Sequence, residues 1–171
     1  MRKFVPGIIL TLVVLPILAV VVSMLGLINA NADQAPSRAE RWLSMRALDA
    51  SVERRAPRDA NPVPVNDATL IEGMKTYVMA CAECHGNLDK KPSAFGVELY
   101  PHAPQLILHP VHDEEWQTFY VIKHGVRNTG MPAWKNLMSD TDIWKMTAFL
   151  SRISNLPPAV QDEWTKATQQ H

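Results

Sequence analysis

The chain has 171 residues, and its 17 basic and 17 acidic side chains give a formal net charge of zero. This balance provides no bulk attraction to nucleic acid, so we expect no nucleic-acid partner. The length suits one ordinary domain with additional segments. The 47% hydrophobic content is concentrated at the N-terminus, so it overstates the apolar character of the rest of the chain.

Residues 4–28 form an uncharged, mostly apolar run directly after Arg2 and Lys3. As a helix with a rise of ~1.5 Å per residue, this run reaches about 37 Å and exceeds a ~30 Å hydrocarbon core. It predicts a retained single-pass anchor in a bacterial inner membrane, with residues 1–3 in the cytoplasm and the remaining chain in the periplasm. The alternative is a cleaved signal peptide, because the Ala-Asn-Ala sequence at 30–32 is an acceptable cleavage site.

Residues 29–65 are predicted to tether this run to the main domain. A helix is expected over residues 37–55, where apolar side chains from Trp42 to Val52 recur at steps of three and four. Residues 56–65 contain three prolines, which restrict the backbone and disfavour a helix. We therefore expect a semi-rigid spacer there.

The main domain is expected over residues 66–156, with a tail over 157–171. Gly125 predicts the end of one helix, and Ser139 with Asp142 predicts the start of another. The segments between the helices are rich in proline, glycine and histidine and show no strand alternation. The sequence thus predicts a small all-α domain with long loops. Its helices are expected within residues 67–86, 113–125 and 139–155.

Cys81 and Cys84, the only cysteines, stand two residues apart and directly before His85. A structural zinc site would need further ligands at a matching spacing, and a thioredoxin-like dithiol would need a βαβ setting. Neither is visible in the sequence. The third use of this pattern is covalent haem attachment, in which the two thiols bond to the haem vinyl groups and the histidine binds the iron. A large apolar cofactor would also add to the core of a small, loop-rich domain.

Residues 66–156 resemble the class I monohaem cytochromes c, of the membrane-anchored bacterial type. The haem-bearing helix of that family has a glycine, an aromatic residue and the first cysteine at steps of four, which are here Gly73, Tyr77 and Cys81. The resemblance implies the cytochrome c fold, in which about three to four helices and long loops surround one covalently bound haem c.

The resemblance also implies the second axial ligand. The Gly-Met-Pro sequence at 130–132 is similar to the distal loop of the family, which makes Met131 the expected ligand opposite His85. A soft, uncharged thioether with an imidazole raises the reduction potential. Bis-histidine ligation would instead need one of the other histidines, whose expected role is that of exposed loop or cap residues. These are His102, His109, His112, His124 and His171.

Three further residues are expected around the haem. Residues 100–106 resemble the family's loop whose proline carbonyl accepts a hydrogen bond from the haem-binding histidine. The resemblance implies that the Pro104 carbonyl orients the ring of His85 in this way, with Pro101 as the alternative acceptor. Arg127 and Trp134 flank the distal loop and could hydrogen-bond the haem propionates.

A cytochrome of this kind is an electron carrier and not an enzyme. The resemblance implies one-electron transfer between protein partners of a respiratory chain, with no small-molecule substrate. The alternative is a permanent haem subunit of a membrane oxidoreductase complex, such as an oxidase, a reductase or a dehydrogenase. A haem enzyme or gas sensor would need an open coordination position, and a purely structural haem subunit would not exchange electrons.

Overall fold

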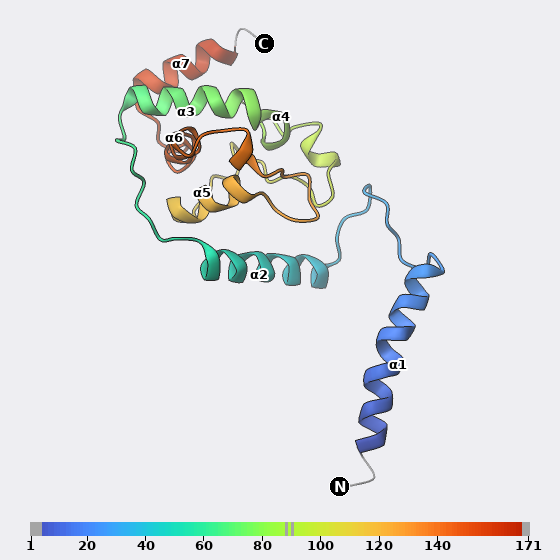
Figure 1. Cartoon of the computed structure of the whole chain (residues 1–171). Helices are drawn as coiled ribbons and strands as arrows, with labels where there is room; N and C mark the ends of the chain where they lie inside the picture. Colours follow the sequence, from blue (N-terminus) through green and yellow to red (C-terminus); the bar gives the residue numbers. More distant parts are fainter. Residues whose placement is uncertain (1–4, 88, 90, 169–171) are drawn as a thin grey trace. The chain divides into compact units, whose positions relative to one another are not determined.

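The computed structural model describes the backbone of residues 5–87, 89 and 91–168. The chain forms two compact units, Met1–Asn31 and Ala32–His171. Within the described residues there are seven α-helices and two short 3-10 helices but no strand (Figure 1). The all-α prediction is therefore confirmed. The expected cytoplasmic end at residues 1–3 lies outside the described residues, as does His171.

The first unit contains a single helix, α1 (Val5–Met24), with Pro16 inside it. The helix ends four residues before Ile28, the expected end of the apolar run. The reason is local, because the backbone at Gly26 has a left-handed φ of 69°, a conformation that favours glycine and terminates helices.

The predicted membrane anchor over residues 4–28 requires correction. Among the residues that the structure describes, no helix has the length and apolar character needed to cross a membrane. This finding contradicts the predicted single-pass anchoring in a bacterial inner membrane.

Helices α3 (Asp67–Ala80) and α6 (Asp140–Leu150) cross at the centre of the second unit. Figure 1 shows α6 nearly end-on beneath α3. The crossing is close because Gly73 has no side chain, and a Cβ atom there would lie 2.2 Å from the carbonyl oxygen of Lys145. The core around this crossing consists of buried side chains from both helices, including Leu70, Met74, Tyr77, Ile143, Met146 and Phe149.

Helix α5 (Glu115–His124) packs against α6 and leads into the loop with Met131. Its N-terminus has a capping box between Glu114 and Gln117, and its C-terminus is the predicted Gly125, with a φ of 66°. The predicted N-cap of α6 is also present, because the Ser139 hydroxyl accepts a hydrogen bond from the backbone N–H of Asp142 at 3.1 Å.

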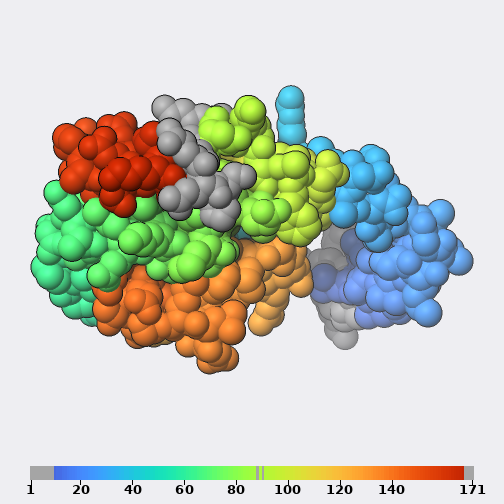
Figure 2. All heavy atoms as spheres, turned by 90° about the horizontal axis from the view of Figure 1, so that it is seen from above, coloured from blue at the N-terminus to red at the C-terminus, as the bar shows by residue number. Residues whose placement is uncertain are grey.

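Helix α7 (Pro158–Thr168) lies in a segment for which no helix was expected. It packs on α3, and Figure 2 shows the red atoms of this segment against green atoms. Val160 is fully buried. The ring of Trp164 lies 5.0 Å from that of Phe149 and 6.4 Å from that of Tyr77, measured between centroids. Tyr77 of α3, Phe149 of α6 and Trp164 of α7 therefore form one aromatic cluster.

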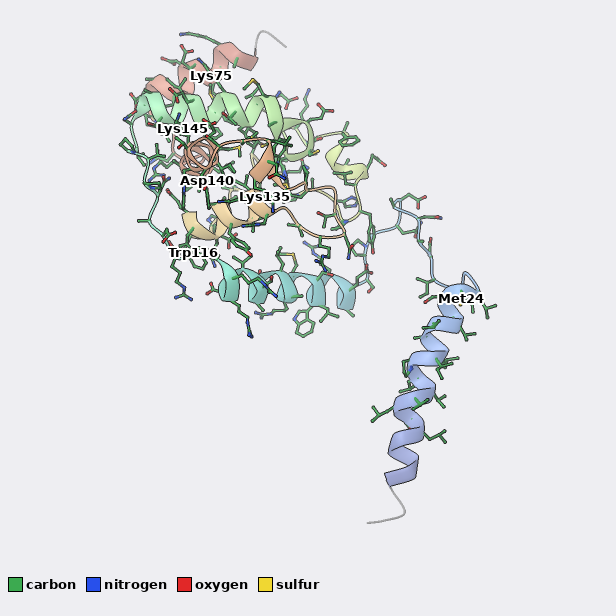
Figure 3. The ribbon with its side chains drawn as sticks, viewed as in Figure 1. Met24, Lys75, Trp116, Lys135, Asp140 and Lys145 are labelled. Carbon is green, nitrogen blue, oxygen red and sulfur yellow. The ribbon has the colours of Figure 1, made fainter. Side chains whose placement is uncertain are left out.

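Helix α2 (Arg38–Arg55) packs on α5 through the buried side chain of Val52. Next to this contact, Glu53 accepts hydrogen bonds from Gln117 at 2.7 Å and from Arg58 at 2.8 Å. The guanidinium of Arg58 also lies over the ring of Trp116, at the end of α5 that faces α2 in Figure 3.

The proline-rich segment after α2 is also bound to the helices. The Asn61 amide donates to the Glu115 carboxylate at 2.8 Å and to the Trp144 carbonyl at 3.2 Å. The same carboxylate accepts hydrogen bonds from Ser151 at 2.8 Å and from Arg152 at 2.6 Å. One glutamate thus joins the spacer to α5 and to the end of α6.

Candidate functional site

The Cys-x-x-Cys-His sequence forms a separate helical turn at the end of α3. Helix α3 stops because Cys81 leaves helical geometry, with φ −121° and ψ −32°. The short helix α4 (Ala82–His85) follows, and the N–H groups of Cys84 and His85 both donate to the carbonyl of Cys81, at 3.1 and 2.9 Å. Gly86 ends the turn with a φ of 91°. This geometry brings both thiols and the imidazole onto one turn of backbone.

The two thiols have different surroundings. Cys81 is buried, and its Sγ lies 3.4 Å from the Sδ of Met146 on α6. Burial, followed by the neighbouring Cys84, raises the pKa of the Cys81 thiol to about 12. The pKa of Cys84 is also raised, by burial first and then by the charge of Glu83. Both groups are therefore neutral thiols near neutral pH.

The imidazole of His85 is held by the loop that follows the 3-10 helix η1 (Gly96–Glu98). Its Nδ1 lies 2.8 Å from the Pro104 carbonyl oxygen, and its own carbonyl accepts a hydrogen bond from the N–H of Leu106 at 2.9 Å. Burial lowers the pKa of His85, while the hydrogen bond to Pro104 acts in the opposite direction. With Nδ1 donating, Nε2 of the neutral ring carries the lone pair that can bind a metal.

The Tyr77 side chain supports the same turn from inside the core. It is fully buried, and its hydroxyl donates to the carbonyl of Gly86 at 2.6 Å. Burial first, and then the neighbouring Cys81, raise the pKa of the phenol, so it remains a hydrogen-bond donor at physiological pH. Tyr77 thus links the core to the residue directly after His85.

The loop that carries Met131 is folded by local hydrogen bonds. The Thr129 hydroxyl donates to the carbonyl of Val126 at 2.8 Å and accepts from the N–H of Met131 at 3.0 Å. At Gly130 a Cβ atom would lie 2.8 Å from the side chain of Leu99, so this loop lies against the segment that leads to Pro104. Met131 is half-buried and packs against the hydrophobic core.

Trp134 and Arg127 differ in their surroundings. Trp134 begins the 3-10 helix η2 (Trp134–Asn136), and its indole Nε1 is buried without a hydrogen-bond partner among the described residues. Such a donor is costly to leave unpaired, so this position can take an acceptor from outside the described residues. A haem propionate provides such an acceptor. Arg127 is exposed, and its expected role at a haem propionate stays a prediction.

Sequence reasoning did not identify Gln105, one of the few buried polar side chains within the described part of the chain. It lies between Pro104 and the apolar pair Leu106 and Ile107. A polar residue inside an apolar stretch was the available signal, but its hydrogen-bond partners are distant in the sequence.

The domain is all-α and carries two thiols and a hydrogen-bonded imidazole on one turn. It also has a buried indole N–H with no acceptor among the described residues. These features fit a haem and are those of the c-type cytochromes. The family model described as cytochrome c oxidase, cbb3-type, subunit III, matches residues 68–150. This part of the chain is a domain of the cytochrome c family, as the sequence predicted. No curated protein and no solved structure matches the chain. Family membership implies haem c, haem-based electron transfer and redox partner proteins.

Proposed function

We propose that this protein is a one-electron carrier with a single haem c bonded to Cys81 and Cys84. His85 and Met131 are the proposed axial ligands. The observation that carries the proposal is the hydrogen bond between His85 Nδ1 and the Pro104 carbonyl, inside a Cys-x-x-Cys-His turn that the family match covers. We further propose residues 66–156 as the haem domain proper.

Each proposed residue has a distinct role. The Pro104 carbonyl holds the tautomer and ring plane of His85, which leaves Nε2 free to bind iron. Met131 offers a soft and uncharged sulfur, a ligand type that favours ferrous iron. Trp134 donates its unpaired indole N–H to a carboxylate, and Tyr77 holds the turn from the core side. When bound, the haem supplies the one-electron exchange between ferric and ferrous iron.

A second candidate is a permanent haem subunit of an oxidase. The description of the matching family, subunit III of an oxidase, favours this reading. The two candidates share the same site and differ in how long the protein stays with its partner. Affinity purification of the full chain from its native cells, followed by mass spectrometry, distinguishes them. A stoichiometric set of partners that survives high salt indicates a subunit, and purification without partners indicates a carrier.

The ligand assignment is tested with Met131→Ala, and Met138→Ala is the matched control. Met138 also packs against the core, but it lies after the distal loop. We expect Met131→Ala to keep covalent haem, to lose the near-infrared sulfur-to-iron charge-transfer band of the ferric protein and to have a lower potential. Met138→Ala should keep the band. A band that survives in Met131→Ala would exclude Met131 as the ligand.

The carrier function is tested with carbon monoxide. With both axial positions filled, the ferrous protein should not bind carbon monoxide at neutral pH, whereas Met131→Ala should bind it. Rapid, stoichiometric binding by the unaltered protein would instead indicate an open coordination position and hence an enzyme or a gas sensor.

A further inference from the structure

The Gln105 side chain is buried, with 9% of its surface exposed, and its hydrogen bonds among the described residues are to backbone atoms. Its Nε2 donates to the Cys84 carbonyl at 3.1 Å and to the Ala103 carbonyl at 2.8 Å. Its Oε1 accepts from the N–H of Ser93 at 2.6 Å. Two carbonyls on one side and one N–H on the other determine the orientation of the amide. The side chain thus joins three separate backbone segments.

Two glycines make room for this amide. A Cβ atom at Gly86 would lie 3.2 Å from Gln105 Oε1, and one at Gly96 would lie 3.1 Å from Gln105 Nε2. At Gly96 the same atom would also lie 1.9 Å from the carbonyl oxygen of Cys84. Larger residues at these two positions would push the amide away from its partners. The space next to Gly86 and Gly96 therefore fits the carboxamide of Gln105 closely.

The bonds of Gln105 lie on both sides of the contact between His85 and Pro104. On the α4 side, the amide holds the carbonyl of Cys84, the residue before His85. On the loop side, it holds the carbonyl of Ala103, the residue before Pro104. The carbonyl of His85 is bound in turn by the N–H of Leu106. The loop and the turn are thus tied together at the residues that flank the imidazole's hydrogen bond.

We propose that Gln105 is a positioning residue that holds the Pro104 carbonyl against Nδ1 of His85 and thereby lowers the reduction potential of the haem. This inference rests on the proposed function. A well-aligned carbonyl makes the imidazole a more basic ligand. A more basic ligand favours ferric iron, so loosening the loop should weaken that preference and raise the potential.

A purely structural role would have a different signature. Loss of a buried amide that satisfies three backbone groups lowers stability whether or not it affects the iron. The reduction potential and the exchange of the His85 Nδ1 proton report on the imidazole itself. A residue that only stabilises the fold would leave both unchanged.

The test uses the full-length haem protein with Gln105→Met, a substitution by an unbranched side chain of similar length. The matched control is Gln117→Met, because Gln117 also bonds through both ends of its amide, to Glu114 N–H at 2.9 Å and to Glu53 at 2.7 Å, but lies at the start of α5. Covalent haem is verified first by the mass of the intact protein. The potential is then measured by spectroelectrochemistry and Nδ1 proton exchange by NMR of the ferrous form.

We expect Gln105→Met to shift the ferrous-to-ferric ratio at a given applied potential by roughly threefold to tenfold, where tenfold equals 59 mV for a one-electron couple. The His85 Nδ1 proton should exchange faster. Gln117→Met should have the potential and the exchange rate of the unaltered protein. Haem-loaded Gln105→Met with unchanged potential and exchange overturns the proposal, even if it is less stable.

A shorter amide provides a second variant. Gln105→Asn is too short to reach Cys84 and Ser93 together, and its potential should also rise. If Gln105→Met does not fold, Gln105→Asn decides alone, since a raised potential supports the proposal and an unchanged one overturns it. Absence of covalent haem from the unaltered protein would refute the proposed function itself, which is a separate outcome.

Discussion

The contact at Gly73 allows a quantitative prediction for the substitution Gly73→Ala. The added methyl group would lie 2.2 Å from the Lys145 carbonyl oxygen and 3.0 Å from the Met146 nitrogen, both backbone atoms of α6. Ordinary van der Waals contact begins at 3.4 Å. Because a helix backbone cannot rotate away as a side chain can, α3 and α6 would have to separate by about 1.2 Å at their crossing.

The expected loss of stability combines two opposing contributions. Overpacking of a well-packed core costs ~1–3 kcal/mol, and the upper value applies here because two backbones must move. Replacing glycine by alanine inside a helix raises the free energy of unfolding by about 1 kcal/mol through helix propensity. The free energy of unfolding should therefore fall by about 2 kcal/mol. At roughly 4 °C per kcal/mol, the Tm should fall by about 8 °C.

The measurement is thermal unfolding of the full chain followed by far-UV circular dichroism. Lys75→Ala is the matched control, because it introduces alanine into the same helix at an exposed position. Its effect should stay within about 0.5 kcal/mol. A Gly73→Ala protein as stable as the control would refute the close crossing of α3 and α6.

Three more predictions concern hydrogen bonds and rings at other places in the fold. Tyr77→Phe should lower the free energy of unfolding by ~1–3 kcal/mol in urea, because the buried Gly86 carbonyl loses its donor; an unchanged midpoint would contradict the bond. Trp164→Ala should cost about 2 kcal/mol in the same assay but keep covalent haem, and loss of haem attachment would show that α7 acts on the site itself. Burial opposes ionisation of Glu115, but its hydrogen bonds and the charge of Arg152 hold the pKa of the carboxyl below its usual value. The stability that the ionised Glu115 provides is therefore present above about pH 4.3 and is lost as the pH falls through the lowered pKa. Glu115→Gln should lower the free energy of unfolding at pH 7 by roughly 1–2 kcal/mol, and its stability should equal that of the unaltered protein in acid. A difference that does not change with pH would argue against this network.

Local sequence signals predicted several helix boundaries well. Gly125 and Ser139 act through their own backbone or side chain within a few residues, so their effect can be predicted from the sequence. The same holds for the Cys-x-x-Cys-His turn, since three reactive side chains within five residues restrict the chemistry to a few known uses. The family match to residues 68–150 confirms the class of protein that these residues predicted.

Long-range contacts could not be predicted in this way. Asn61 and Glu115 are 54 positions apart, and nothing in the sequence around either one indicates the hydrogen bond between them. The three bonds of Gln105 likewise join segments that only the folded chain brings together. Helix α7 had a local signal in the apolar pair Val160 and Trp164, but the preceding prolines favoured an irregular tail.

The apolar run at the N-terminus shows that a short-range feature can also be missed when the prediction rests on composition. Composition predicted a continuous helix to Ile28, whereas the left-handed backbone at Gly26 ends α1 at Met24. Composition averages over a window, so it does not register a single residue that terminates a helix.

The packing of α2 and α7 has a consequence for truncation of this protein and for its cleavage by proteases. A shortened protein limited to residues 66–156 would lack Arg58, whose guanidinium lies over Trp116. It would also lack Trp164, whose ring packs against Tyr77 and Phe149. It would expose apolar surface on two sides and should aggregate more readily than the whole second unit. A protease should accordingly cleave before Arg38 much faster than between Val52 and Trp164, so the fragment that survives digestion should be larger than the region that defines the family.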